Sequence, residues 1–187
     1  MSDPDEGALV RRAQAGDLDA YELLVRGHAD QLYAVILRVV GNRQDAEDIT
    51  QETLLRGWRA IGSFRGGSRF STWLRRIAIN ETNRFLERGA RRRSQQSVEE
   101  QEDRLASPAD QQPAARAELH ALQDALRLAV AQLPVKLRVA LELRDMEGLS
   151  TREAAAVVGI REAAFKTRLH QARMKVRTAL GDAALLA

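Results

Sequence analysis

The chain has 187 residues, a formal net charge of +3 and no cysteine, which excludes a disulfide framework, a thiolate zinc site and a cysteine nucleophile. Its first ten residues are acidic and lack the apolar core of a signal peptide, and no apolar run approaches the length that spans a bilayer. We therefore expect a soluble cytoplasmic protein without membrane insertion, made of one ordinary domain or two small ones.

Two helices are predicted in residues 8–41. The first ends at Gly16, Asp17 or Asp19 caps the second, and Gly41 ends it. Apolar residues at helical spacing are expected to face a core. They are Leu9, Val10, Ala13, Leu24, Leu32, Ile36 and Val39.

Residues 43–59 are expected to form a helix with one acidic face. Asp45, Asp48 and Glu52 stand at positions i, i+3 and i+7, so their side chains share one side of the helix. Acids in a first turn favour the helix dipole, and charged faces are commonly just solvated. The alternative is a docking surface for a basic partner, and the pattern alone leaves both open. Gly57 costs about 1 kcal/mol relative to alanine, which predicts close packing there.

Residues 64–93 combine aromatic side chains with nine arginines and only two glutamates. This combination suits a single-stranded or partly opened nucleic acid, because arginines follow phosphates while other groups hold unstacked bases. The stretch starts in a loop over residues 62–69, where Gly66 and Gly67 permit backbone angles that other residues disfavour. The loop is either a plain turn between helices or one that wraps around a flipped base.

A helix is predicted after this loop, with Ser68 or Ser71 as its cap. Phe70 and Trp73 are expected in the core rather than as stacking platforms. Glu81 falls near the apolar side and does not fit the pattern. The opposite side carries groups that can hydrogen-bond to base edges, namely Thr72, Arg76, Asn80 and Asn83.

Residues 94–113 are rich in acids and glutamine, poor in apolar residues, and contain two prolines. This composition is typical of a flexible linker. It separates a first domain, residues 1–93, from a second, residues 114–187. The predicted fold is therefore all-α, with two small helical domains joined by a flexible linker.

The second domain is predicted to open with a helix that ends near Leu133. Pro134 suits the start of the next helix, which Gly148 ends. The expected apolar stripe of the opening helix comprises Leu119, Leu122, Leu126 and Val130.

Residues 149–180 carry the pattern of a helix-turn-helix. Ser150 or Thr151 with Glu153 resembles a capping box, and Gly159 turns the chain into a longer helix. A basic amphipathic helix can also bind a membrane surface, but the capped helix and glycine turn favour the DNA major groove. The expected buried face comprises Phe165, Leu169, Ala172 and Val176. The expected exposed basic face comprises Lys166, Thr167, Arg168, His170, Arg173 and Arg177.

No catalytic constellation is visible in the sequence. There is no phosphate-binding glycine loop, no GxSxG and no HExxH, and the three histidines have no metal-ligand spacing. We therefore predict a protein that is not an enzyme, with no metal and no cofactor.

Two segments resemble a known family. Residues 45–80 read DAEDITQETLLRGWRAIGSFRGGSRFSTWLRRIAIN and closely resemble region 2 of bacterial sigma factors of the extracytoplasmic function (ECF) group. Residues 133–173 read LPVKLRVALELRDMEGLSTREAAAVVGIREAAFKTRLHQAR and resemble their region 4. The DAED…QET…W run together with FSTWLRRIA-x-N is highly specific for this family, whereas a helix-turn-helix alone would be weak evidence for it.

The resemblance implies a sigma factor that binds core RNA polymerase and directs it to particular promoters. Its first domain would open and read the −10 element, and its second would read the −35 element. It also implies an anti-sigma partner that masks both domains until a signal arrives.

The family pattern also implies roles for individual residues. The surface that grips the clamp helices of the largest polymerase subunit would comprise Asp45, Asp48, Gln51 and Glu52. The loop that captures a flipped base of the non-template strand, with the helix beside that strand, would comprise Ser63, Phe64, Arg65, Gly66, Gly67, Ser68, Arg69, Arg76, Asn80 and Asn83. The surface facing the −35 duplex would comprise Lys166, Thr167, Arg168, His170, Gln171 and Arg173.

Three positions depart from the family pattern. They bear on which promoter is preferred, and not on the assignment to the family. Ala163-Ala164 replaces a common glycine-threonine, Arg84 a common acid, and Glu81 an apolar or small residue. The main alternative function is a stand-alone helix-turn-helix regulator of duplex DNA, which would need neither the acidic face nor the strand-binding stretch. A module that sequesters a sigma factor would not need an exposed basic helix.

Overall fold

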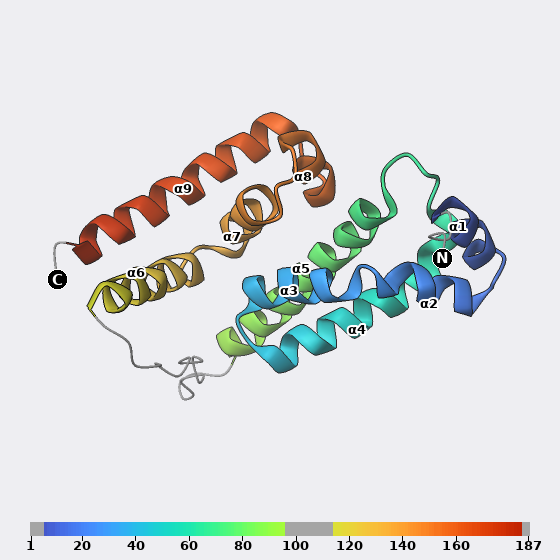
Figure 1. The fold of residues 1–187 in the computed structure, drawn as a ribbon, viewed down its shortest axis with the longest axis horizontal. Helices are drawn as coiled ribbons and strands as arrows, with labels where there is room; N and C mark the ends of the chain where they lie inside the picture. Colours follow the sequence, from blue (N-terminus) through green and yellow to red (C-terminus); the bar gives the residue numbers. More distant parts are fainter. Residues whose placement is uncertain (1–5, 96–113, 185–187) are drawn as a thin grey trace. The chain divides into compact units, whose positions relative to one another are not determined.

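The computed structural model describes residues 6–95 and 114–184, and within these ranges every regular element is a helix (Figure 1). The predicted all-α fold is confirmed. The chain forms two compact units, the first made mainly of residues 6–95 and the second mainly of residues 114–184. Residues 96–113, which make up most of the predicted linker, lie outside the described part. None of the described helices is long and apolar enough to cross a membrane.

The first unit is a bundle of helices joined by short connections. Its elements are α1 (Glu6–Gln14), α2 (Leu18–Arg26), α3 (Ala29–Val40), α4 (Arg43–Ala60), the 3-10 turn η1 (Ile61–Ser63) and α5 (Phe70–Gln95).

Residues 8–41 contain three helices, so the prediction of two was wrong. The chain breaks at Gly27, whose N–H bonds to the Val25 carbonyl, and α3 follows His28. Apolar residues keep a helical spacing on both sides of this break, which is why periodicity alone joined α2 to α3. The predicted cap is confirmed, because the Asp17 side chain accepts a hydrogen bond from the Ala20 N–H at 3.0 Å.

An aromatic cluster forms part of the core of the first unit. Phe70 is fully buried, and its ring centroid lies 5.8 Å from that of Phe64 and 5.6 Å from that of Trp73. The prediction that Phe70 and Trp73 belong to the core is confirmed. Helix α5 begins at Phe70, so Arg69 precedes it and neither predicted serine cap does. Instead, the Arg69 carbonyl accepts the first helical hydrogen bonds.

Gly57 is the point where α4 approaches its neighbours most closely. A Cβ atom there would collide with the Tyr21 hydroxyl and lie 3.1 Å from Cδ1 of Leu74. Tyr21 cannot easily move away, because it is buried and its hydroxyl donates to the Leu54 carbonyl at 2.7 Å. Burial raises the pKa of the Tyr21 phenol, so the hydroxyl keeps its proton and this hydrogen bond. The predicted close packing at Gly57 is confirmed.

The second unit contains the helix-turn-helix. Its elements are α6 (Ala114–Ala131), α7 (Val135–Leu141), the π-helical turn η2 (Glu142–Met146), α8 (Thr151–Val158) and α9 (Glu162–Ala184). The capping box is confirmed, since the Ser150 N–H donates to Oε2 of Glu153 at 2.9 Å and the Glu153 N–H donates to Oγ of Ser150 at 3.2 Å. Gly159 turns the chain with a φ of 74°.

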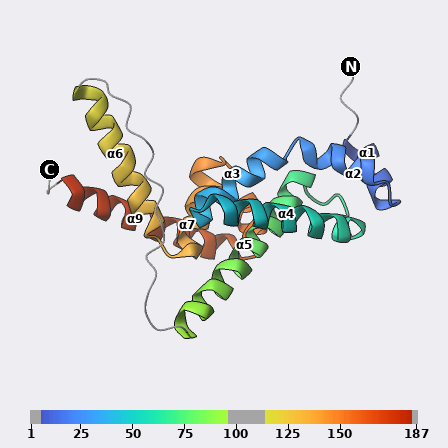
Figure 2. The same ribbon diagram turned by 90° about the horizontal axis from the view of Figure 1, so that it is seen from below.

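The predicted apolar stripe of α6 is only partly correct. Leu122 and Leu126 are 57% and 43% exposed. The helix buries its C-terminal end instead, where Ala129 joins a cluster with Ala172 and Val176 of α9. Figure 2 shows α6 diverging from α9 away from this end, which leaves the earlier leucines uncovered. The predicted buried face of α9 is confirmed at all four positions, Phe165, Leu169, Ala172 and Val176.

We expect Gly57→Ala to lower the free energy of unfolding by about 1–2 kcal/mol, because overpacking outweighs the gain in helix propensity. In a Tyr21→Phe background the colliding hydroxyl is absent, so the same substitution should cost much less. Urea unfolding of the four variants measures this coupling. Gly27→Ala is the matched control, because its Cβ would meet no atom within 4 Å. An equal cost in both backgrounds would contradict the packing argument.

Candidate nucleic-acid interface

The acidic face predicted from the sequence lies along α4. Asp48 and Gln51 are exposed, while Asp45 and Glu52 are half-buried. Asn42 fixes the start of the helix, because its side chain accepts a hydrogen bond from the Asp45 N–H at 3.0 Å. The four residues therefore lie within the first three turns of one capped helix.

Glu81 has a structural explanation that the sequence did not supply. It is 4% exposed, and its carboxylate pairs with Nε of Arg56 at 3.0 Å and with Nη1 of Arg84 at 2.8 Å. Arg56 also pairs with Glu52 at 2.7 Å. A chain of alternating charges thus ties α4 to α5. The i, i+4 spacing of Glu52 and Arg56 and the i, i+3 spacing of Glu81 and Arg84 were visible signals of its two local pairs.

The loop between η1 and α5 is anchored at its first residue and open beyond it. Phe64 is 9% exposed, with its ring in the aromatic cluster, so the ring is not a free stacking platform. Residues 65–69 are exposed, and Gly66 has a φ of 70°. Oγ of Ser63 donates to the Ala60 carbonyl at 2.7 Å, which closes the turn before the loop.

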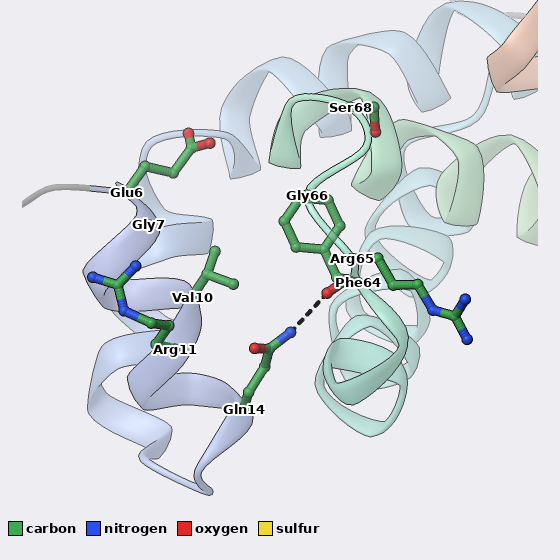
Figure 3. Close-up of a pocket in the computed structure, with 9 residues that line it drawn as sticks. All are labelled: Glu6, Gly7, Val10, Arg11, Gln14, Phe64, Arg65, Gly66 and Ser68. Carbon is green, nitrogen blue, oxygen red and sulfur yellow. Dashed lines mark hydrogen bonds between the residues drawn. The ribbon is translucent and has the colours of Figure 1, made fainter.

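A hollow of about 510 Å³ lies between this loop and α1 (Figure 3). Gln14 reaches across it, and its side-chain nitrogen donates to the carbonyls of Phe64 at 2.8 Å and Ile61 at 3.2 Å. The sequence did not indicate a functional role for α1. The contact joins residues about fifty positions apart, so no local sequence pattern could have predicted it. The hollow is lined by Glu6, Gly7, Val10, Arg11, Gln14, Phe64, Arg65, Gly66 and Ser68.

The predicted strand-facing side of α5 is largely accessible. Arg76 and Asn80 are exposed, and Asn83 and Thr72 are half-buried. Arginine donates to base edges and phosphates through its guanidinium N–H groups, and asparagine both donates to and accepts from base edges. This side of α5 can therefore follow a nucleic-acid strand that leaves the loop.

The predicted recognition surface on α9 is exposed at five of its six positions. Arg168 is half-buried, and the exposed residues include Arg173. Arg173 is already paired, with its guanidinium donating to both carboxylate oxygens of Asp145 at 3.0 and 2.6 Å. This pair raises the pKa of Arg173. It also ties α9 to η2, so Arg173 has a structural partner besides any duplex.

A second hollow, of about 310 Å³, adjoins this surface. It brings Arg144 and Thr151, which sequence reasoning did not select, beside residues of α9. Arg144 and Lys166 beside this concavity attract an anion such as a DNA phosphate, whereas Arg173 is already paired with Asp145. The hollow is lined by Arg144, Thr151, Lys166, Leu169, His170 and Arg173. Among the described residues, no group of histidine and acidic side chains could hold a metal ion.

Comparison with known proteins gives the same division of the chain. Residues 24–93 match the family Sigma-70 region 2, and residues 123–176 match Sigma-70, region 4. The RNA polymerase sigma-H factor of Pseudomonas aeruginosa is 34% identical over 185 residues, 96% of each chain. The ECF RNA polymerase sigma-E factor of Escherichia coli K12 is 34% identical over 170 residues, 88% of each chain.

Two solved structures are also similar. CnrH, in complex with the cytosolic domain of CnrY, has 28% identity and a TM-score of 0.65, covering 95% of this chain and 97% of CnrH. The sigma factor RpoE of Bartonella quintana, in complex with the anti-sigma factor NepR, has 27% identity and a TM-score of 0.66, covering 88% of this chain and 97% of RpoE.

A helical region 2 and a helix-turn-helix region 4 in one chain define an RNA polymerase sigma factor. The chain belongs to the sigma-70 family, in the extracytoplasmic function group.

We expect Glu81→Gln to lower the free energy of unfolding by about 1–2 kcal/mol, because two charge-assisted hydrogen bonds to arginines are weakened. Urea unfolding measures the change. Glu87→Gln is the control, since Glu87 is exposed on the same helix, and it should stay within about 0.5 kcal/mol of wild type. Equal stability of the two variants would contradict a stabilising role for the α4–α5 charge chain.

Proposed function

We propose that this sigma factor holds core RNA polymerase through α4, opens and reads the −10 element through the loop and α5, and reads the −35 element through α9. The observation that carries this proposal is the presence in one chain of an exposed acidic helix face, a loop beside a hollow, and an exposed basic recognition helix. It acts in the cytoplasm, where transcription occurs. No step of catalysis is assigned to the chain.

The polymerase surface is the acidic side of α4, which docks on the clamp helices of the largest subunit. Asp48 and Gln51 supply exposed polar groups, and Leu55, 51% exposed, adds an apolar contact one turn further along. Glu52 is shared with Arg56, so a basic partner has to compete with that arginine for the carboxylate.

The −10 element is held as an unpaired strand. Removing a base from the stack costs a few kcal/mol, and a loop that receives the base offsets this cost. The exposed residues 65–69 and the adjoining hollow are suited to this task, and Arg76 and Asn80 follow the strand along α5.

The −35 element is held as a duplex by α9 in the major groove. Lys166, Thr167 and His170 are exposed on the helix that follows the Gly159 turn. Phosphate contacts fix the register of a recognition helix, and the hollow containing Arg144 supplies a place for one.

An anti-sigma protein is the proposed regulatory partner. It rests on the similarity to RpoE, which was solved bound to the anti-sigma factor NepR. Such a protein would keep both regions from polymerase until a signal arrives.

Transcription in vitro tests the proposed function. Purified chain, core polymerase and genomic fragments are mixed, and transcripts are sequenced from their 5′ ends. We expect chain-dependent start sites that share paired upstream motifs. If a control sigma factor initiates but this chain does not, while the chain alone shifts duplex DNA, a stand-alone helix-turn-helix regulator is the better description.

We predict that Asp48→Arg with Glu52→Arg abolishes polymerase binding, because the reversed charges repel a basic docking surface. Size-exclusion chromatography with core polymerase measures binding, and circular dichroism checks the fold. Glu22→Arg with Asp30→Arg makes the same charge change at exposed sites on α2 and α3 and should bind normally. Normal binding by the α4 variant would remove the docking surface from the proposal.

We predict that Lys166→Ala with Arg168→Ala weakens use of the −35 element and lowers the salt slope of promoter binding by about 2. Fluorescence anisotropy of holoenzyme on promoter DNA over a range of salt concentrations measures the slope. The control, Lys136→Ala with Arg127→Ala, removes the same charge from exposed sites on α7 and α6. An identical slope for both double variants would be evidence against the recognition surface.

A further inference from the structure

Gln14 connects two parts of the first unit that are distant in sequence. Its side-chain nitrogen donates to the carbonyls of Ile61 and Phe64, 47 and 50 residues away. Figure 3 shows the hydrogen bond to Phe64. A carboxamide nitrogen has two N–H donors, so these two carbonyls use both of them. Gln14 therefore has no side-chain donor left for another ligand.

The two carbonyls mark the point where the chain leaves η1 and enters the loop. The Phe64 ring is held on the other side by Phe70 and Trp73, with ring centroids 5.8 and 5.4 Å away. Phe64 is thus held by its ring and by its carbonyl. The exposed residues 65–69 start from this fixed point, so the direction in which the loop leaves the core depends on both anchors.

The carbonyl anchor also defines the hollow. Figure 3 shows Gln14 and Val10 pointing from α1 toward the loop, with the Phe64 ring opposite Val10. The volume of about 510 Å³ lies in the range of ligand pockets, roughly 300–1,000 Å³. Val10 and Phe64 are each only 9% exposed, so the hollow offers a nucleobase a small apolar surface beside the polar groups of the loop.

We propose that α1 is the second wall of the site that receives an unpaired nucleotide of the −10 strand, and that Gln14 is the positioning residue that keeps the loop at the right distance from that wall. The proposal rests on the proposed role of the loop in base capture. It adds that α1, which precedes the matched Sigma-70 region 2, takes part in promoter opening.

The hydrogen bonds of Gln14 indicate that it positions the loop and does not donate to the base. Because both donors of Gln14 are used by the loop, hydrogen bonds donated to a captured base have to come from the loop or from other residues that line the hollow. Losing Gln14 should weaken strand binding mainly through the captured base and leave contacts elsewhere on the strand unchanged.

The experiment combines Gln14 variants with an abasic scan. Holoenzyme is bound to the single-stranded non-template −10 oligonucleotide of the strongest promoter found in vitro, with one base at a time removed. In the wild type, one position should be most sensitive, losing about tenfold or more in affinity, as stacked or pocketed bases do. Gln14→Met, which keeps the length but has no donor, should bind the intact strand about tenfold more weakly and show a penalty of less than about twofold at that position.

Two further variants distinguish the effect of a hydrogen-bond donor at position 14 from the effect of an added positive charge. Gln14→Lys restores a donor and should recover most of the wild-type affinity and of the abasic penalty. Gln14→Met with Ala15→Lys adds the same charge at an exposed neighbouring site without restoring the donor, and should behave like Gln14→Met. Gln14 is itself exposed, so these changes leave the core intact, and circular dichroism confirms this for each protein.

The possible outcomes distinguish this inference from the proposed function. A wild-type holoenzyme with no sensitive position would overturn base capture by the loop. A sensitive position whose penalty is unchanged in Gln14→Met would leave base capture standing and overturn the role of α1. Failure of Gln14→Lys to recover binding, or recovery by the Ala15→Lys control, would also overturn the positioning role.

Discussion

The close approach of α4 to α2 and α5 at Gly57 is the constraint on which the first unit depends. The Tyr21 hydroxyl fills the space where a side chain would stand and bonds to the Leu54 carbonyl. Leu74 of α5 contacts the same position, so this contact sets the spacing of α4 and α5, which carry the proposed polymerase and strand surfaces. The Glu81 charge chain joins the same helices further along. A change at either contact would therefore disturb both surfaces together.

The loop before α5 combines fixed ends with exposed residues between them. Its glycine conformations and exposed residues allow it to adapt to a nucleotide, while Phe64 is fixed by its ring in the core and by its carbonyl on Gln14. Because the buried Phe64 and Phe70 hold the two ends of the loop, residues 65–69 lose less conformational entropy on binding than an unanchored segment would. In the proposed capture step, the fixed position of Phe64 and the exposure of residues 65–69 would act together.

Acidic and basic side chains are concentrated on different helices, so the small net charge does not reveal the charged surfaces. The chain carries only +3, yet α4 carries acids on one side while α5 and α9 carry exposed arginines and lysine, which are the proposed polymerase and DNA surfaces. Several of these charges are paired within the protein, among them Glu52 with Arg56 and Arg173 with Asp145. Exposed pairs of this kind contribute about 0–1 kcal/mol each, so a stronger partner can take over one member at little cost.

Features that depend only on nearby residues could be predicted from the sequence. The Asp17 cap, the Ser150–Glu153 capping box, the buried face of α9 and the close packing at Gly57 all followed from local spacing or residue type. The family resemblance was equally readable, because its motifs are continuous runs, and the roles that it implies for single residues stay predictions. Only the tertiary structure revealed the Glu81 pairing with Arg56, the Gln14 tether and the break at Gly27, and it alone showed that Leu122 and Leu126 are uncovered. The physical reason is that periodicity states which side of a helix is apolar, whereas the partner of that side, or of a single polar group, is chosen by elements far away in the chain.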